Sequence, residues 1–237
     1  MNITEGRKQR AQKVVIYGAE GIGKTTLAAQ FPDPLILDLE GGSSQLDVRR
    51  VEDIRTWAEL GSTVIEVIND TSICKTLIID TADKAEAMAT EAVCEERKVK
   101  GIEDIGYGKG YTYLAEKMAS LISTLDILIR KGVNVVIIAH AAMRKFEQPD
   151  EMGAYDRWEL KLSKKVAPLF KEWADMLLFL NYKTQVVKRE GGSAKARGGE
   201  RVVYASHHPC WDAKNRHGLP DEFPLDYEEI KKAIEEE

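Results

Sequence analysis

The sequence contains little cysteine and no long apolar run. Its 237 residues include only three cysteines, Cys74, Cys94 and Cys210, and none of them forms a CxxC spacing. This pattern argues against a disulfide framework and favours a reducing compartment. The longest apolar stretches, such as Val133–Ala142, are too short to span a bilayer, and the polar, basic N-terminal segment lacks the apolar centre of a signal peptide. We therefore expect a cytoplasmic protein with no membrane contact.

An excess of positive charge is also missing, because 34 Lys and Arg residues stand against 39 Asp and Glu residues, for a net charge of −5. A nucleic-acid surface over the whole chain is therefore not expected. A mildly basic stretch, 141–217, nevertheless precedes an acidic one, 218–237, and this order permits a local phosphate-binding surface. Internal repeats and clear linkers are absent from the sequence. We expect one domain over 1–237, with a basic N-terminal segment (1–12) and an acidic C-terminal helix or tail (221–237).

Short β-rich runs alternate with helical stretches, which predicts an α/β fold with a parallel sheet and crossover helices. Most of the runs are almost continuously apolar, as expected for strands covered on both faces. The predicted strands are Lys13–Tyr17, Leu35–Leu39, Thr76–Asp80, Val133–Ala139 and Asp175–Tyr182. The predicted helices are Lys24–Gln30, Ile54–Asn69, Asp83–Lys98 and Tyr113–Lys131.

One motif predicts a phosphate site with high specificity. The segment Gly18-Ala19-Glu20-Gly21-Ile22-Gly23-Lys24-Thr25 fits GxxxxGK[ST], with a strand before it and a helix after it. The glycines let backbone N–H groups surround phosphate oxygens, and the start of the helix adds a favourable field. Lys24 is expected to reach the β- and γ-phosphates of ATP, and the Thr25 hydroxyl to bind Mg²⁺, with Thr26 next to them.

Two further strand ends supply carboxylates. Asp80 ends Thr76–Asp80 and is the predicted second ligand of Mg²⁺, because open α/β sheets bind ligands at this edge. Glu40 follows Leu35–Leu39 and is the predicted base that orients or deprotonates water. A capping role for Asp80 and a solvated strand end for Glu40 are the alternatives. Asp83 is expected to be the N-cap of the next helix.

The order of these elements resembles the RecA/DnaB class of oligomeric ATPases, most closely the small phage-type, core-only RecA-like recombinases or single-strand annealing proteins. The resemblance implies a RecA-like P-loop fold, with a mostly parallel sheet flanked by helices and a C-terminal β-hairpin extension. It implies catalytic roles for Glu40 and Lys24, and a γ-phosphate sensor role for His140, which could instead be a buried histidine bonded to backbone. Lys214 and Arg216 resemble the basic pair that reaches a neighbouring subunit's ATP site, although a solvated basic turn is the alternative.

The same resemblance implies two DNA-facing loops, Val99–Thr112 and Ala141–Lys161, and a homo-oligomeric ring or filament acting on single-stranded DNA. Phage or host replication and recombination proteins are further expected partners. A third irregular segment, Glu190–Glu200, is predicted to be the tip of a β-hairpin. The candidate DNA contacts are Lys100, Lys109, Arg144, Lys145, Lys161, Lys164, Lys165, Tyr107, Tyr111, Tyr155 and Trp158.

Other functions remain open at this point. A P-loop small-molecule kinase would need an arginine-rich lid, which we do not find, and an ATP-dependent protein switch would need no DNA. The cluster His207, His208, Cys210 and His217 lacks the paired spacing of a zinc site and is expected to be a surface strand end. Ile230 and Ile234 predict a C-terminal helix that docks through an apolar stripe.

Overall fold

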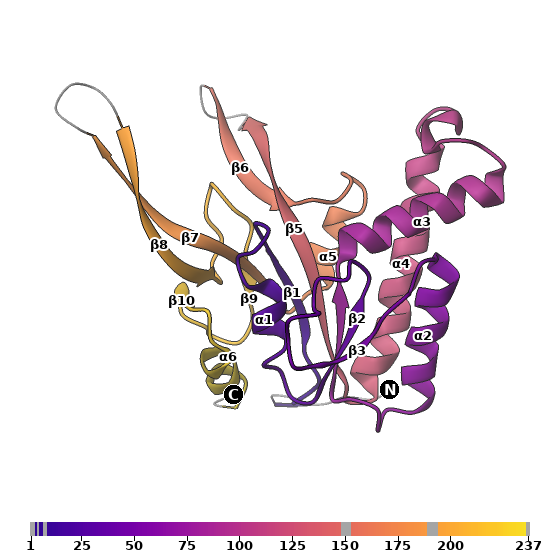
Figure 1. Ribbon diagram of the computed structural model, residues 1–237, viewed down its shortest axis with the longest axis horizontal. Helices are drawn as coiled ribbons and strands as arrows, with labels where there is room; N and C mark the ends of the chain where they lie inside the picture. Colours follow the sequence, from indigo (N-terminus) through magenta and orange to yellow (C-terminus); the bar gives the residue numbers. More distant parts are fainter. Residues whose placement is uncertain (1–2, 4, 7–8, 148–152, 189–193, 236–237) are drawn as a thin grey trace.

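The protein has a central β-sheet with helices on both faces (Figure 1). The computed structural model describes residues 3, 5–6, 9–147, 153–188 and 194–235. Within these residues, no helix combines the length and the apolar character that crossing a membrane requires.

The sheet is built around parallel strands in the order β7-β1-β5-β4-β2-β3. All the predicted strands are present, and β5 and β7 extend much further than expected. Antiparallel strands continue the sheet beyond β7 in the order β10-β8-β7, so the predicted α/β class and mostly parallel sheet are confirmed. The parallel strands are β1 (Lys13–Gly18), β2 (Pro34–Asp38), β3 (Arg49–Val51), β4 (Thr76–Asp80), β5 (Asn134–Glu147) and β7 (Met176–Lys188).

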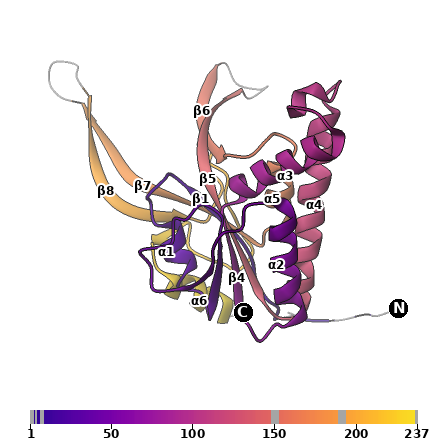
Figure 2. The ribbon, with the colours of Figure 1, turned by 45° about the vertical axis from the view of Figure 1, so that its right-hand side comes forward.

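Successive residues of the central strands enter two different cores, because neighbouring side chains on a strand point to opposite faces. On β1, Val15 and Tyr17 belong to the larger core, whereas Val14 and Ile16 belong to the smaller one. The larger core is covered by α2 (Trp57–Asn69), α3 (Ala82–Arg97), α4 (Lys109–Arg130) and α5 (Ala167–Trp173). The smaller core is covered by α1 (Lys24–Ala28) and the acidic α6 (Tyr227–Glu235), which lie on the other face (Figure 2).

The segment Ala141–Lys161, predicted as a DNA-facing loop, is mainly a β-hairpin, so the prediction of a loop is wrong, while its contact with DNA stays a prediction. β5 continues to Glu147 and pairs in antiparallel fashion with β6 (Ala154–Leu160). Exposed and half-buried side chains alternate from Met143 to Glu147. This alternation is typical of an antiparallel strand that has one face in solvent. The polar composition of the segment is the reason that the sequence indicated a loop.

A second hairpin leaves the sheet from β7, as predicted, although its second strand already begins at Ala194, inside the segment Glu190–Glu200 that was predicted to be the tip. β7 pairs with β8 (Ala194–Tyr204), while the tip residues 189–193 lie outside the described part of the chain. Both hairpins project beyond the body on the same side in Figures 1 and 2. The remaining strands are the short β9 (Lys214–Asn215), paired with β7, and β10 (Glu222–Pro224), paired with β8.

The glycine-rich loop after α3 is shorter than predicted. A 3₁₀ turn, Ile102–Asp104, follows α3, and α4 already begins at Lys109 instead of Tyr113. Gly110 allows this early start, because a Cβ there would lie 2.5 Å from the carbonyl oxygen of Ile102. The backbone contact between the turn and α4 therefore requires glycine.

Candidate nucleotide-binding site

The loop between β1 and α1 has the backbone geometry of a phosphate site. Gly18 ends β1 against β7, where a Cβ would lie 2.4 Å from the carbonyl oxygen of Leu180. Gly21 and Gly23 have positive φ angles of 70° and 106°, which side-chain-bearing residues rarely adopt. α1 begins at Lys24, and the Ile22 side chain is buried in the smaller core. The predicted strand, loop and helix are thus all present.

The Lys24 side chain lies inside this loop. Its ammonium group donates hydrogen bonds to the carbonyl oxygens of Gly18 (3.2 Å) and Ala19 (2.9 Å). Burial lowers the pKa of Lys24, while the nearby carboxylates of Asp80, Asp83 and Glu40 act in the opposite direction. A buried cation held by backbone oxygens is an effective partner for phosphate oxygens, because these carry full negative charge.

Thr25 of α1 and Asp80 of β4 meet at the edge of the sheet although β1, which precedes α1, and β4 are not neighbouring strands. β5 lies between β1 and β4, yet the Thr25 hydroxyl donates a 2.7 Å hydrogen bond to Asp80 Oδ2. Burial is the main cause that raises the pKa of Asp80. Two hard oxygen ligands held together in this way fit a Mg²⁺ ion. Thr25 and Asp80 would hold the ion, which would neutralise charge on bound phosphates.

Glu40 lies in a turn that Asp38 stabilises. The Asp38 carboxylate accepts hydrogen bonds from the backbone N–H groups of Gly41 (2.8 Å) and Gly42 (3.1 Å) and from the Ser43 hydroxyl (2.6 Å). These bonds outweigh the effect of burial and lower the pKa of Asp38. Glu40 is thereby placed so that its carboxylate accepts a 2.7 Å hydrogen bond from the Thr81 hydroxyl.

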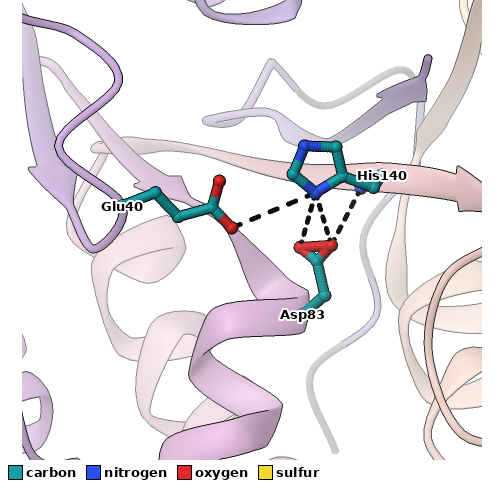
Figure 3. Close-up of side chains that lie close together, drawn as sticks. All are labelled: Glu40, Asp83 and His140. Carbon is teal, nitrogen blue, oxygen red and sulfur yellow. Dashed lines mark hydrogen bonds and ion pairs between the residues drawn. The ribbon is translucent and has the colours of Figure 1, made fainter. Parts of the chain in front are cut away.

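His140 interacts with two carboxylates that come from other elements (Figure 3). Its Nδ1 lies 2.7 Å from Asp83 Oδ1 and 4.0 Å from Glu40 Oε1. The hydrogen bond with Asp83 is the main cause that raises the pKa of His140, against the effect of burial. For Asp83, burial acts to raise the pKa, but the hydrogen bonds from His140 and Thr81 outweigh it and lower the pKa.

The prediction that Asp83 caps the next helix is wrong. α3 begins at Ala82, and Thr81 is its N-cap, with a side chain that accepts a hydrogen bond from the Lys84 N–H. Asp83 is therefore already inside the first turn of the helix, where it faces His140. The sequence alone could not distinguish the two positions, because Thr and Asp are both good caps.

These groups share one cavity of about 340 Å³ at the C-terminal edge of the sheet. It brings together most predicted residues of the phosphate loop, the predicted Mg²⁺ ligands, Glu40 and His140, whereas Gly18, Ala19 and Ile22 do not line it. The sequence did not indicate four of the lining residues, which are Gly42, Gln45 and Leu46 after β2 and Arg201 of β8. The lining residues are Glu20, Gly21, Gly23, Lys24, Thr25, Thr26, Glu40, Gly42, Gln45, Leu46, Asp80, His140 and Arg201.

Lys214 and Arg216 lie elsewhere. Lys214 belongs to β9, which pairs with the first residues of β7, whereas the phosphate loop adjoins the part of β7 near Leu180. The Lys214 ammonium donates hydrogen bonds to the carbonyl oxygens of Lys171 and Glu172, and Arg216 forms a 2.9 Å ion pair with the buried Asp175. They do not line the cavity of their own chain, so a role in a neighbouring subunit's site stays a prediction.

The histidine and cysteine cluster does not form a metal site among the residues that the structure describes. His208 stacks on Trp211 with ring centroids 4.1 Å apart, and its Nδ1 accepts a hydrogen bond from the Cys210 N–H. His207 lies near Asp212 instead. His207, His208 and Cys210 follow the end of β8 at Tyr204, close to the expected surface strand end.

A second cavity, of about 560 Å³, unites parts of the two segments predicted to face DNA. Of the candidate DNA contacts, it contains two tyrosines and three cations; the others do not line it, and Tyr155 and Trp158 pack against Phe146 and Phe179. The lining residues are Tyr107, Gly108, Tyr111, Arg144, Ser163, Lys164 and Lys165.

The parallel sheet, the phosphate loop and the paired Thr25 and Asp80 together define a P-loop ATPase. The chain matches the family described as AAA domain over residues 10–217, and it belongs to that family. Membership supports nucleotide binding and NTPase activity in general.

Individual proteins give weaker similarities. The SPbeta prophage-derived uncharacterized protein YorG of Bacillus subtilis (strain 168) is 29% identical over 136 residues, which are 56% of this chain and 42% of that protein. The match thus spans less than half of the curated relative. The flagellar accessory protein FlaH of Methanocaldococcus jannaschii is similar in structure with a TM-score of 0.41 and 10% identity, over 83% of this chain and 78% of FlaH.

Proposed function

We propose that this protein is an ATPase that acts on single-stranded DNA as a homo-oligomer, in the manner of a recombinase or a strand-annealing protein. The observation that carries the proposal is the second cavity, which combines the exposed Tyr107 and the half-buried Tyr111 with three cations. Tyr107 is fully exposed, and Lys164 and Lys165 are exposed as well. Stacking on rings together with phosphate contacts is the usual way in which proteins bind single strands.

Polar contacts hold the cavity in place, and they involve several of the residues that line it. The Arg144 guanidinium donates a 2.7 Å hydrogen bond to the Leu162 carbonyl, and Lys165 donates one of 2.7 Å to the Thr112 hydroxyl. Tyr111 hydrogen-bonds to Glu103. These bonds join the β5–β6 hairpin, the segment before α5 and the start of α4, so a strand bound here would contact all three.

Two elements connect this cavity to the ATP site. β5 carries His140 at the ATP site and Arg144 at the cavity, a separation of about 13 Å along an extended strand. In the first turns of α3, Asp83 bonds to His140, and the Glu86 carboxylate accepts hydrogen bonds from the Ser163 N–H (3.0 and 3.2 Å). A movement of His140 or Asp83 on γ-phosphate loss would therefore reach both sides of the cavity.

Hydrolysis requires a group that orients water beside the terminal phosphate. Glu40 is suited to this role, since it lines the cavity with Lys24, its side chain is 36% exposed, and its carboxylate accepts a hydrogen bond from Thr81. It would accept a proton from the attacking water, while Lys24 stabilises negative charge on the phosphate. The 4.0 Å contact between Glu40 and His140 supports a sensor role for His140.

The decisive experiment compares ATPase activity with and without single-stranded DNA. The variant Lys164→Ala/Lys165→Ala should keep the basal activity but lose most of the stimulation, because it removes two phosphate contacts. The pair Lys231→Ala/Lys232→Ala on α6 is the matched control and should behave like the unaltered chain. The affinity of the unaltered chain for single-stranded DNA should fall with rising salt, and the slope of log affinity against log salt concentration should become shallower by about 1.4 in the variant.

Several outcomes would contradict the proposal. If the unaltered protein hydrolyses ATP without binding DNA at any salt concentration, the cavity serves another partner. If the α6 control loses as much stimulation as the cavity variant, the effect is one of total charge only. Phosphoryl transfer to a small molecule by a monomer would instead identify a kinase.

A further inference from the structure

We propose that Arg201 binds the phosphate chain of the nucleotide held in its own chain. Arg201 lies on β8, far in sequence from the glycine-rich loop, and belongs to no recognisable motif. Its side chain nevertheless lines the cavity that contains Lys24, Thr25 and Asp80. The proposal rests on the nucleotide-binding half of the proposed function and is independent of the DNA-binding half.

Strand register places Arg201 beside the phosphate loop. Gly18, the last residue of β1, is level with Leu180 of β7, which in turn is level with Val203 of β8. Because β8 runs antiparallel to β7, Arg201 lies two residues further out, roughly 7 Å beyond the level of Gly18. The phosphate loop occupies this same region beyond the end of β1.

The side chain also points to the correct face of the sheet. Arg201 and Val203 are two residues apart and therefore share a face, and Val203 packs in the smaller core with Ile22 and Leu27. A Cβ built on Gly23 would lie 3.4 Å from Nη1 of Arg201. The guanidinium thus reaches the backbone that directly precedes Lys24.

The environment of Arg201 suits an anionic ligand. Among the residues that the structure describes, Arg201 forms no ion pair or hydrogen bond through its side chain, and it is exposed. Two other cations near this edge of the sheet already have partners in the protein. Lys24 donates hydrogen bonds to Gly18 and Ala19, and Lys183 forms an ion pair with Glu222. A guanidinium matches the geometry of phosphate oxygens and can bind two of them at once.

Calorimetric titrations without DNA test this proposal. Arg201→Ala should weaken binding of MgATP and of inorganic tripolyphosphate by about tenfold or more, because a charge-assisted hydrogen bond is lost. Arg201→Lys should recover part of the affinity. Lys183→Ala removes an exposed cation from the same hairpin and should leave both affinities within about twofold of the unaltered chain.

Three outcomes of these titrations would contradict the proposal or the site on which it rests. Unchanged affinity in Arg201→Ala would overturn the proposal while leaving the phosphate loop intact. A loss for MgATP with no loss for tripolyphosphate would overturn it too, because Arg201 would then contact the base or ribose. If the unaltered protein bound neither ligand, the nucleotide site itself would be refuted. Circular dichroism of all variants checks that they are folded.

Discussion

The two hairpins leave the sheet on opposite sides of β1 and differ in how they are anchored. β5 and β7 both flank β1, and both continue past its end at Gly18. The β5–β6 hairpin is fixed at the middle of β6, where Arg157 pairs with Asp212 and the backbone N–H of Trp158 donates to the Cys210 carbonyl. The base of β7–β8 is held by ring stacking between Phe179 and Tyr204 and by the surface pair of Lys183 and Glu222.

The difference suggests a division of roles around one nucleotide. The firmly anchored hairpin supplies His140 and Arg144, so it connects the ATP site to the tyrosine-lined cavity. The other hairpin supplies Arg201, whose side chain is free to close on a ligand. The β5–β6 hairpin would then respond to the presence or absence of the γ-phosphate through His140. The β7–β8 hairpin would bind the phosphates through Arg201.

The largest expected effect comes from Lys24, which lines the cavity to which both hairpins contribute a residue. Lys24→Ala should weaken MgATP binding by about 100-fold or more, or ~2.7 kcal/mol, because a buried cation is lost from the phosphate site. Hydrolysis should fall to background. Equilibrium binding of MgATP measures the effect, and a variant that binds as tightly as the unaltered chain would place the nucleotide elsewhere.

Glu40→Gln should separate binding from chemistry. We expect hydrolysis to fall by a factor on the order of 100, since a general base is lost, while MgATP affinity changes little. Single-turnover hydrolysis and calorimetry provide the two measurements. A variant with full activity would assign the water-orienting role to another group.

The same variant tests the prediction that Arg216 acts across subunits. Arg216→Ala alone should also be impaired, and mixing it with Glu40→Gln should recover part of the activity, because some interfaces then pair an intact Glu40 with an intact Arg216. A mixture no more active than its components would restrict Arg216 to its ion pair with Asp175.

A smaller effect is expected where the ATP site meets the anchored hairpin. Asp83→Asn should reduce stimulation by DNA by about fivefold to tenfold with little change in MgATP affinity, since His140 loses its partner while Lys24 keeps its contacts. His140→Gln and the double variant complete a cycle. Additive effects in that cycle would show that the two residues do not act together.

The smallest expected effect is on how the free energy of unfolding depends on pH. The pKa of His140 is raised, so the stabilisation of the folded state by its charged form is complete below about pH 6.5. This stabilisation is lost as the pH rises through the raised pKa. The pKa of Asp83 is lowered, so its contribution is lost only as the pH falls below about 4 and through the lowered value. Urea unfolding should show a stability difference between the unaltered chain and Asp83→Asn that is about 1 kcal/mol larger at pH 5.5 than at pH 9. Equal differences at both values would contradict a charged pair.

The sequence predicts best what neighbouring residues determine. The phosphate loop depends on local backbone freedom at Gly21 and Gly23, and Asp80 is placed by the edge of its own strand, so both follow from short segments. The β5–β6 hairpin was missed because polar alternation on an exposed strand looks like a loop. Arg201 was missed because only the pairing of β7 with β8 brings it to Gly23, and such long-range register has no local signal.

The outer strands of the sheet influence how copies of this protein can associate. In the described part of the chain the sheet path ends at β3 and β10, which contain three residues each, and β10 includes Pro224. Short edges and proline offer few free backbone groups to an approaching strand. Strand addition at β3 or β10 would therefore be weak, so subunits of a ring or filament would have to recognise one another through side chains, loops or the two projecting hairpins.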